Sequence, residues 1–286
     1  MDPLNSVDVV LAGVPRGGTT LACRLLNQVR DTVALSEPMP VHQLPIAPAP
    51  ALAAVIAFYD HVRQRALGEK IVPSEQRDGR VADNSWGERS PDGGTRAHLV
   101  ELGEITIDKP LSAHFRLAIK HPAAFTALLP VLSTHFRVVG IVRNPLAVLA
   151  SWRSLDLPLS RGRAPAAERI DRALATALDA EPDLLRRQVV LLDWYFERLL
   201  RWVPDQRRIR YEDIIGSGGR ALLRAAGVPE EDALAQPLRS HNTNLQYDFN
   251  EVDELLASLR EHATSCWQCY SRDEVESLAR MMTHHG

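Results

Sequence analysis

The chain has 286 residues, of which 45% are hydrophobic and 24% are charged, a composition typical of a soluble globular protein. The net charge of −3 predicts no general affinity for nucleic acid or for an acidic membrane surface, so any basic site must be local. The three cysteines are too few for a disulfide framework, and the absence of a signal-peptide pattern and of a long apolar run predicts a cytoplasmic protein without a membrane span.

The first predicted element is a buried strand, an apolar run from Val7 that breaks at Gly13. A turn that contains Pro15 and Arg16 follows, and after it apolar residues recur every four positions, which indicates a helix. A strand, a glycine turn and a helix N-terminus in this order form an anion-binding architecture, because backbone N–H groups and the helix dipole both face the ligand.

The spacing of this turn is that of a nucleotide-triphosphate loop. Four residues separate Gly13 from Gly18, and Thr19 and Thr20 come next. Thr19 stands where such a loop needs its phosphate-binding lysine, and the nearest cation is Arg16, inside the turn. We therefore expect a loop that binds phosphate but lacks a group on which ATP and GTP hydrolysis depends.

Strands and helices alternate along the rest of the chain. We expect strands at 32–35, 105–110, 116–120, 136–143 and 208–211. We expect helices at 51–67, 123–132, 146–152 and 185–203. The proline-rich stretch 38–50, the polar stretch 68–96 and residues 154–165 are expected to be irregular. This alternation predicts an α/β three-layer sandwich with a mainly parallel, doubly wound sheet, and residues 1–286 are expected to form a single domain.

A second phosphate-type motif lies at the end of the predicted strand 136–143. This strand ends in Arg143, and Ser151 follows eight residues later, in the next helix. Ligands bind at the carboxyl ends of such strands, and arginine makes charge-assisted, often bidentate bonds to phosphate. The alternative is that Arg143 caps the strand and Ser151 faces solvent, but the combination with the turn at Arg16 favours a ligand site.

Both motifs resemble those of sulfotransferases that use 3′-phosphoadenosine 5′-phosphosulfate (PAPS). The turn at 15–20 is similar to the 5′-phosphosulfate loop of that family, although the family usually has serine at the position of Gly17. Arg143 and Ser151 resemble its 3′-phosphate motif, and Arg239-Ser240-His241-Asn242 resembles a late basic loop that closes over the 3′-phosphate in relatives. Tyr211, followed by Glu-Asp, is a weaker match to a tyrosine beside the adenine, and a core tyrosine is an equal alternative.

The resemblance implies a P-loop sulfotransferase that moves a sulfuryl group from PAPS to a hydroxyl or amine of a small-molecule or carbohydrate acceptor, by in-line transfer with a general base and without a metal. The residues that it implies for PAPS are Arg16, Gly17, Gly18, Thr19, Thr20, Arg143, Ser151 and Tyr211. Arg16 would meet the charge on the leaving phosphate oxygen. The segments 38–104 and 153–183 would form the acceptor side, a homodimer is a further possibility, and the acceptor itself stays open.

The general base has more than one candidate. Glu37, just after the second strand, resembles the glutamate of carbohydrate and tyrosyl members and is favoured. His121 lies near the histidine of small-molecule members, but Lys120-His121-Pro122 does not match their Lys-x-His pattern, and His42 is a third candidate. Adjacent strand residues point in opposite directions, so Lys120 and His121 cannot both face the cofactor. Lys120 either assists Arg16 or ends its strand in solvent.

Two other functions compete with the sulfotransferase. A P-loop kinase for small molecules is disfavoured by Thr19, which replaces the lysine, and by Arg143, which stands where a kinase would place a magnesium-binding aspartate. A non-catalytic nucleotide-binding protein could keep both motifs, and turnover alone separates it from an enzyme. Cys266 and Cys269 are expected to be unrelated thiols, because the further ligands that a zinc site needs are not evident.

Overall fold

The computed structural model describes residues 5–82, 84–88, 96–229, 237–244 and 247–284. Its centre is a five-stranded sheet in the order β2-β5-β1-β6-β7, and each neighbouring pair is parallel. The strands are β1 (Asn5–Gly13), β2 (Thr32–Ser36), β5 (Arg116–Lys120), β6 (Phe136–Val142) and β7 (Arg208–Arg210). The predicted α/β class with a mainly parallel sheet is thereby confirmed.

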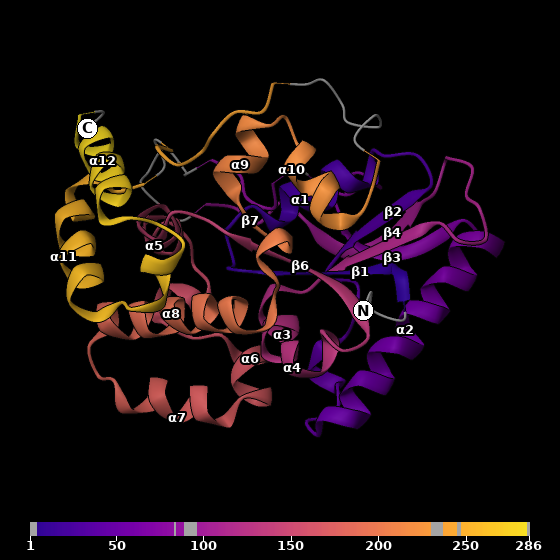
Figure 1. Cartoon of the computed structure of the whole chain (residues 1–286), viewed down its shortest axis with the longest axis horizontal. Coiled ribbons are helices and arrows are strands. Elements are labelled where there is room, and N and C mark those ends of the chain that lie inside the picture. Colours follow the sequence, from indigo (N-terminus) through magenta and orange to yellow (C-terminus); the bar gives the residue numbers. More distant parts are fainter. Residues whose placement is uncertain (1–4, 83, 89–95, 230–236, 245–246, 285–286) are drawn as a thin grey trace.

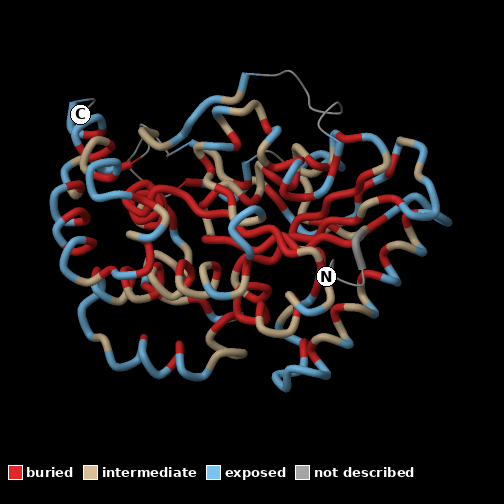
Figure 2. Tube along the Cα trace, viewed as in Figure 1, coloured by how far each residue is buried: buried red, intermediate tan, exposed pale blue. Residues whose placement is uncertain are grey.

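Helices cover both faces of the sheet (Figure 1). Val9 and Leu11 of β1 pack on one face against α1 (Thr19–Asn27), α9 (Tyr211–Gly216) and α10 (Arg220–Ala226). The alternate residues Val10 and Ala12 pack on the other face, whose helices include α2 (Pro48–Gly68), α3 (Pro122–Ala127) and α8 (Leu184–Trp202). The strands are therefore buried on both sides, as the dense buried centre in Figure 2 shows.

The remaining helices connect and enclose these layers. They are α4 (Leu129–Leu132), α5 (Pro145–Arg153), α6 (Pro165–Ile170), α7 (Arg172–Ala180), α11 (Val252–His262) and α12 (Arg272–Thr283). Short 3₁₀ helices are η1 (Val41–Gln43), η2 (Pro158–Arg161), η3 (Asp205–Arg207), η5 (Phe249–Glu251) and η6 (Ser265–Gln268). Among the described residues, no helix combines the length and the apolar character that a bilayer crossing requires.

A small antiparallel hairpin corrects two of the predictions. It pairs β3 (Ile71–Gln76) with β4 (Glu101–Thr106), outside the central sheet. The expectation of an irregular stretch at 68–96 is thus wrong for 71–76, and the strand expected at 105–110 ends earlier, at Thr106; residues 83 and 89–95 lie outside the described part of the chain. Pro73 and the polar residues after it obscured β3, because proline is uncommon in strands other than edge strands.

Three further segments differ from the predictions. Helix α2 begins at Pro48, inside the stretch expected to be irregular, because proline is well suited to the first turn of a helix. The helix expected at 123–132 is divided into α3 and α4. The segment 153–183, expected to be a loop on the acceptor side, contains η2, α6 and α7.

Candidate functional site

All five strands of the central sheet end at one edge, and each delivers one charged or aromatic side chain there. Arg16, Glu37, Arg143 and Tyr211 follow β1, β2, β6 and β7, and Lys120 is the last residue of β5. All five line one cavity of about 560 Å³. The carboxyl edge of an open parallel sheet is where such folds bind ligands, so the structure brings these predicted residues together at the expected edge.

The turn between β1 and α1 is fixed by backbone contacts and by tight packing. Val14 N donates to Ile141 O at 3.0 Å, and Trp152 Nε1 donates to Pro15 O at 2.9 Å. Gly18, the N-cap of α1, has a φ of 96°, and a Cβ there would lie 2.6 Å from the Tyr211 ring. Since no side chain caps α1, its first N–H groups are available to a ligand in the cavity.

Gly17 occupies the position where the sulfotransferase pattern has serine, and the structure gives a reason for the difference. Gly17 N donates to Val14 O at 2.8 Å, which closes the turn tightly. A Cβ on Gly17 would lie 2.7 Å from the same carbonyl oxygen. A serine would therefore require the turn to shift, so in this conformation the turn offers backbone groups rather than a hydroxyl.

Arg143 is buried and bonded to several acceptors. Its Nε donates to Asn242 Oδ1 at 2.8 Å, and its Nη1 donates to Arg16 O at 2.9 Å. Its Nη2 donates to His241 O at 2.6 Å and to the Tyr247 hydroxyl at 3.1 Å. The segment 237–244 thus lies directly over this guanidinium, and its residues 239–242 are those that the resemblance implied for a loop over the 3′-phosphate.

Arg16 and Ser151 connect the first motif to the second. Arg16 Nε donates to Ser151 Oγ at 3.2 Å. Ser151 lies in α5 with no exposed surface, so the alternative in which it faces solvent is wrong. Burial, with the nearby Arg96 and Arg143 and against an opposing effect of Tyr247, lowers the pKa of Arg16 to about 10.

This end of the cavity is electropositive. Burial lowers the pKa of His241, and so do the guanidinium groups of four arginines, which are Arg143, Arg239, Arg96 and Arg16. The Tyr211 ring lies 4.8 Å below the Arg143 guanidinium, and its hydroxyl accepts from His241 N at 3.0 Å. Tyr211 is 3% exposed and forms part of the cavity wall.

Lys120 and Glu37 form a partly buried ion pair at another part of the cavity. Lys120 Nζ donates to Glu37 Oε1 at 2.8 Å and to the hydroxyls of Thr20 and Ser36 at 3.3 Å each. Burial alone would lower the pKa of Lys120, but the charges of Glu37 and Glu75 outweigh it and raise that pKa. Only 5% of the Lys120 side chain is exposed, so this lysine does not end its strand in solvent.

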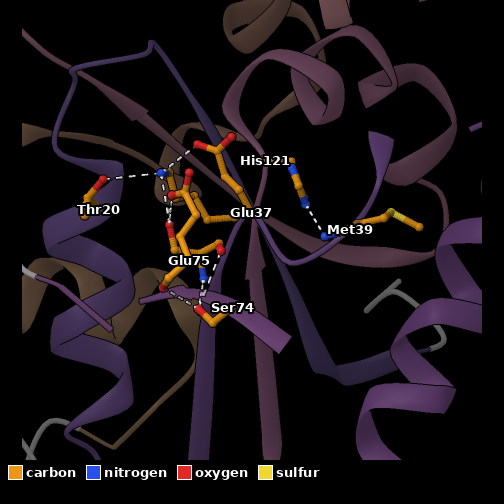
Figure 3. Close-up of polar contacts among 8 residues, drawn as sticks. Thr20, Glu37, Met39, Ser74, Glu75 and His121 are labelled. Atoms are coloured by element: carbon orange, nitrogen blue, oxygen red, sulfur yellow. Dashed lines mark hydrogen bonds and ion pairs between the residues drawn. The ribbon is translucent and has the colours of Figure 1, made fainter. Parts of the chain in front are cut away.

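His121 lies outside the cavity lining, in contrast to Lys120 before it. Its Nε2 accepts from Met39 N at 3.0 Å (Figure 3). Its ring packs edge-on against Phe125, with the ring centroids 5.1 Å apart. Burial lowers the pKa of His121 to about 4, so the ring is neutral. The geometry is that of a core histidine; His42, in η1, also lies outside the cavity lining.

The sequence did not identify Glu75, a third charged group beside Lys120. Glu75 lies in β3, lines the cavity, and its Oε2 accepts from Ser36 Oγ at 2.8 Å. No local signal marks it, because its strand was expected to be irregular. The hydroxyl of Tyr195, another lining residue, is buried and has no hydrogen-bond partner among the described residues.

Neither cysteine of the C-terminal pair takes part in a disulfide or in a metal-binding cluster among the described residues. Cys266 is buried and Cys269 half-buried, and both are free. Over the described residues, no group of three histidine, cysteine, aspartate or glutamate side chains is arranged to hold a metal.

No protein-family model matches the sequence, and no curated protein matches it either.

Proposed function

We propose that the protein is a PAPS-dependent sulfotransferase that acts on a hydroxyl or amine of a small molecule. The observation that supports this most is the division of one cavity into two chemically different parts. Arg16 and Arg143 supply cations at one part, and Lys120 with two carboxylates occupies the other. A polyanionic donor fits the first part, and a group that must lose a proton fits the second.

The residues of the first turn fit a 5′-phosphosulfate. The N-terminus of α1 has no side-chain cap, and Thr19 and Thr20 line the cavity beside it. Gly18 lets the Tyr211 ring pack closely against this turn, because a Cβ there would lie 2.6 Å from that ring. Arg16, in the same turn, is positioned to offset charge on the oxygen that leaves with the phosphate.

The surroundings of Arg143 fit a 3′-phosphate that replaces two of its present hydrogen-bond acceptors. Two acceptors of its guanidinium, His241 O and Asn242 Oδ1, are neutral oxygens of the segment 237–244. A phosphate makes stronger, charge-assisted bonds with a guanidinium, so the exchange is favourable once this segment moves aside. Ser151, already bonded to Arg16, would keep the two motifs together.

PAPS would supply an activated sulfuryl group with a good leaving group. Lys120 and the arginines would offset the charge that builds up during its transfer, and a carboxylate beside Lys120 would take the proton of the acceptor. Glu37, the base predicted from the sequence, lies in the cavity, with 39% of its side chain exposed. A kinase would need magnesium, so turnover in the presence of a chelator separates the two activities.

Nucleotide-dependent stabilisation tests the proposal. Adenosine 3′,5′-bisphosphate at about a hundredfold over its dissociation constant should add about 2.7 kcal/mol to the free energy of unfolding. Adenosine 5′-monophosphate, which lacks the 3′-phosphate, should add much less, and Arg143→Ala should remove most of the difference. Equal stabilisation by the two nucleotides would contradict the proposal.

A product screen then identifies the acceptor. The purified protein is incubated with PAPS, a chelator and a panel of hydroxylated and amino compounds, and products are detected by mass. A sulfated product separates the enzyme from a non-catalytic nucleotide-binding protein. The Arg16→Ala variant is the matched control, because loss of the Arg16 guanidinium should remove turnover while leaving most of the nucleotide site intact.

A further inference from the structure

Two carboxylates share one ammonium group in the cavity. Lys120 Nζ contacts Glu37 directly at 2.8 Å. It is connected to Glu75 through a hydroxyl, since it donates to Ser36 Oγ at 3.3 Å and this hydroxyl donates to Glu75 Oε2 at 2.8 Å. When both carboxylates are ionised, the cluster of Lys120, Glu37 and Glu75 therefore carries a net charge of −1.

The hairpin fixes the position of Glu75. Ser36 N donates to the fully buried Ser74 Oγ at 3.1 Å, which attaches β3 to the end of β2. Glu75 is the next residue, paired in the hairpin with Leu102. Figure 3 shows the side chains of Glu75 and Glu37 close together, whereas His121 points toward Met39.

The surroundings of the two carboxylates affect their proton affinity in opposite directions. Burial alone would raise the pKa of Glu37, but the charge and hydrogen bond of Lys120 lower it. Burial and the charge of Glu37 raise the pKa of Glu75, against the weaker opposing effects of Lys120, Ser36 and His98. An ion-paired carboxylate is a poor proton acceptor, and one with a raised pKa is better matched to neutral pH.

We propose that Glu75 takes the proton of the acceptor and that Glu37 holds Lys120 in place. As the acceptor oxygen or nitrogen bonds to sulfur, its bond to hydrogen breaks and the proton passes to a carboxylate oxygen of Glu75. The bond between sulfur and the bridging oxygen breaks, and the electron pair leaves with the phosphate beside Arg16. Glu75 returns the proton to solvent after the product leaves. This inference rests on the proposed sulfotransferase function.

Melting temperature against pH tests the charge states without any substrate. Because the pKa of Glu75 is raised in the folded state, its ionisation opposes folding, and Glu75→Gln should melt higher than wild type at about pH 8. The difference should shrink as the pH falls toward the ordinary glutamate pKa of about 4.3. Glu37→Gln should show the opposite sign at about pH 8, since it removes the partner of Lys120.

The matched control is Glu101→Gln, in the same hairpin. Glu101 is exposed and accepts from Gln76 Nε2 at 3.0 Å, so its replacement should leave the pH profile of melting unchanged. A lower melting temperature for Glu75→Gln at about pH 8 would overturn the proposal, because it would mean that ionised Glu75 stabilises the fold.

Turnover with PAPS and the acceptor found by the product screen tests the catalytic role. Glu75→Gln should lower kcat about 10²- to 10⁴-fold with unchanged affinity for adenosine 3′,5′-bisphosphate. Ser36→Ala should move the acidic limb of the kcat/KM profile to higher pH, because it removes the hydrogen bond that favours ionised Glu75.

The outcomes separate the inference from the function on which it rests. Full kcat in Glu75→Gln, with sulfation by the wild type intact, would overturn the role of Glu75 alone. A wild-type protein that neither binds adenosine 3′,5′-bisphosphate nor sulfates any acceptor would overturn the proposed function and this role together.

Discussion

Replacing Lys120 by methionine is the most direct test of the charge arrangement in the cavity. The substitution keeps most of the apolar stem but removes the ammonium group, so that Glu37 and Glu75 remain without their common cation. Removing one partner of a fully buried ion pair costs about 3–5 kcal/mol. An exposed pair is worth about 0–1 kcal/mol.

The structure places this ion pair between those limits. The side chain of Lys120 is 5% exposed, but that of Glu37 is 39% exposed, so water already screens one partner. We therefore expect Lys120→Met to lower the free energy of unfolding by about 2 kcal/mol near neutral pH. For a chain of this size class, that loss corresponds to a fall in melting temperature of about 4–8 °C.

The pH dependence of this loss follows from the two pKa shifts. Lys120 has a raised pKa in the folded state, so its contribution is present below its unfolded pKa and is lost as the pH rises through the folded value. Glu37 has a lowered pKa, so its contribution is present above its unfolded pKa and is lost as the pH falls through the folded value. The difference between wild type and Lys120→Met should therefore be largest between about pH 5 and pH 10.

Differential scanning fluorimetry over this pH range measures the effect. The control is Lys70→Met, which removes an exposed lysine at the start of the hairpin and for which a small change in melting temperature is expected. A loss in Lys120→Met that stays constant down to about pH 3 would refute the reasoning, because it would come from lost packing rather than from the ion pair.

Two further predictions concern the arginines and His121. Arg143→Ala should raise the KM for PAPS, whereas Arg16→Ala should mainly lower kcat, because only Arg16 would contact charge that develops in the transition state; steady-state kinetics with the opposite pattern would mean that the two roles are exchanged. His121→Asn should lower the free energy of unfolding by about 1–3 kcal/mol, since Met39 N loses its buried acceptor. Its affinity for adenosine 3′,5′-bisphosphate and its kcat should stay near those of wild type, and an inactive His121→Asn with intact affinity would make His121 the base.

The sequence identified the residues that follow the strands of the central sheet. Most of these strands are short apolar runs with β-branched residues, whereas β7 is only Arg-Ile-Arg. In a parallel sheet the carboxyl ends of the strands must share one edge. Arg143 and Glu37 are far apart in the chain, yet this rule alone places them at one edge. Strand alternation also predicted that Lys120 and His121 would not face the same site, and only Lys120 lines the cavity, although β5 ends at Lys120 and His121 is already the N-cap of α3.

The sequence could not locate Glu75, and it indicated the segment that covers Arg143 only through the family resemblance. The position of Glu75 depends on the contact between Ser36 and Ser74, which lie 38 residues apart, and no local pattern encodes such a contact. Pro73 also weakened the strand signal. The bonds from Arg143 to residues 241 and 242 join segments about a hundred residues apart, so only the folded chain shows them.

The charged cluster at Lys120 also helps to separate an enzyme from a nucleotide-binding protein. Binding a nucleotide would need the arginine-rich part of the cavity and the N-terminus of α1, but it would gain nothing from Glu37 and Glu75, because carboxylates repel phosphates. The fold does not need the cluster either, since well-packed apolar residues of similar volume are often as stabilising as buried charges. Two carboxylates and a lysine beside an electropositive pocket are instead suited to removing a proton next to a transferred anionic group. The arrangement of charge in this cavity therefore favours the proposed transfer reaction over nucleotide binding alone.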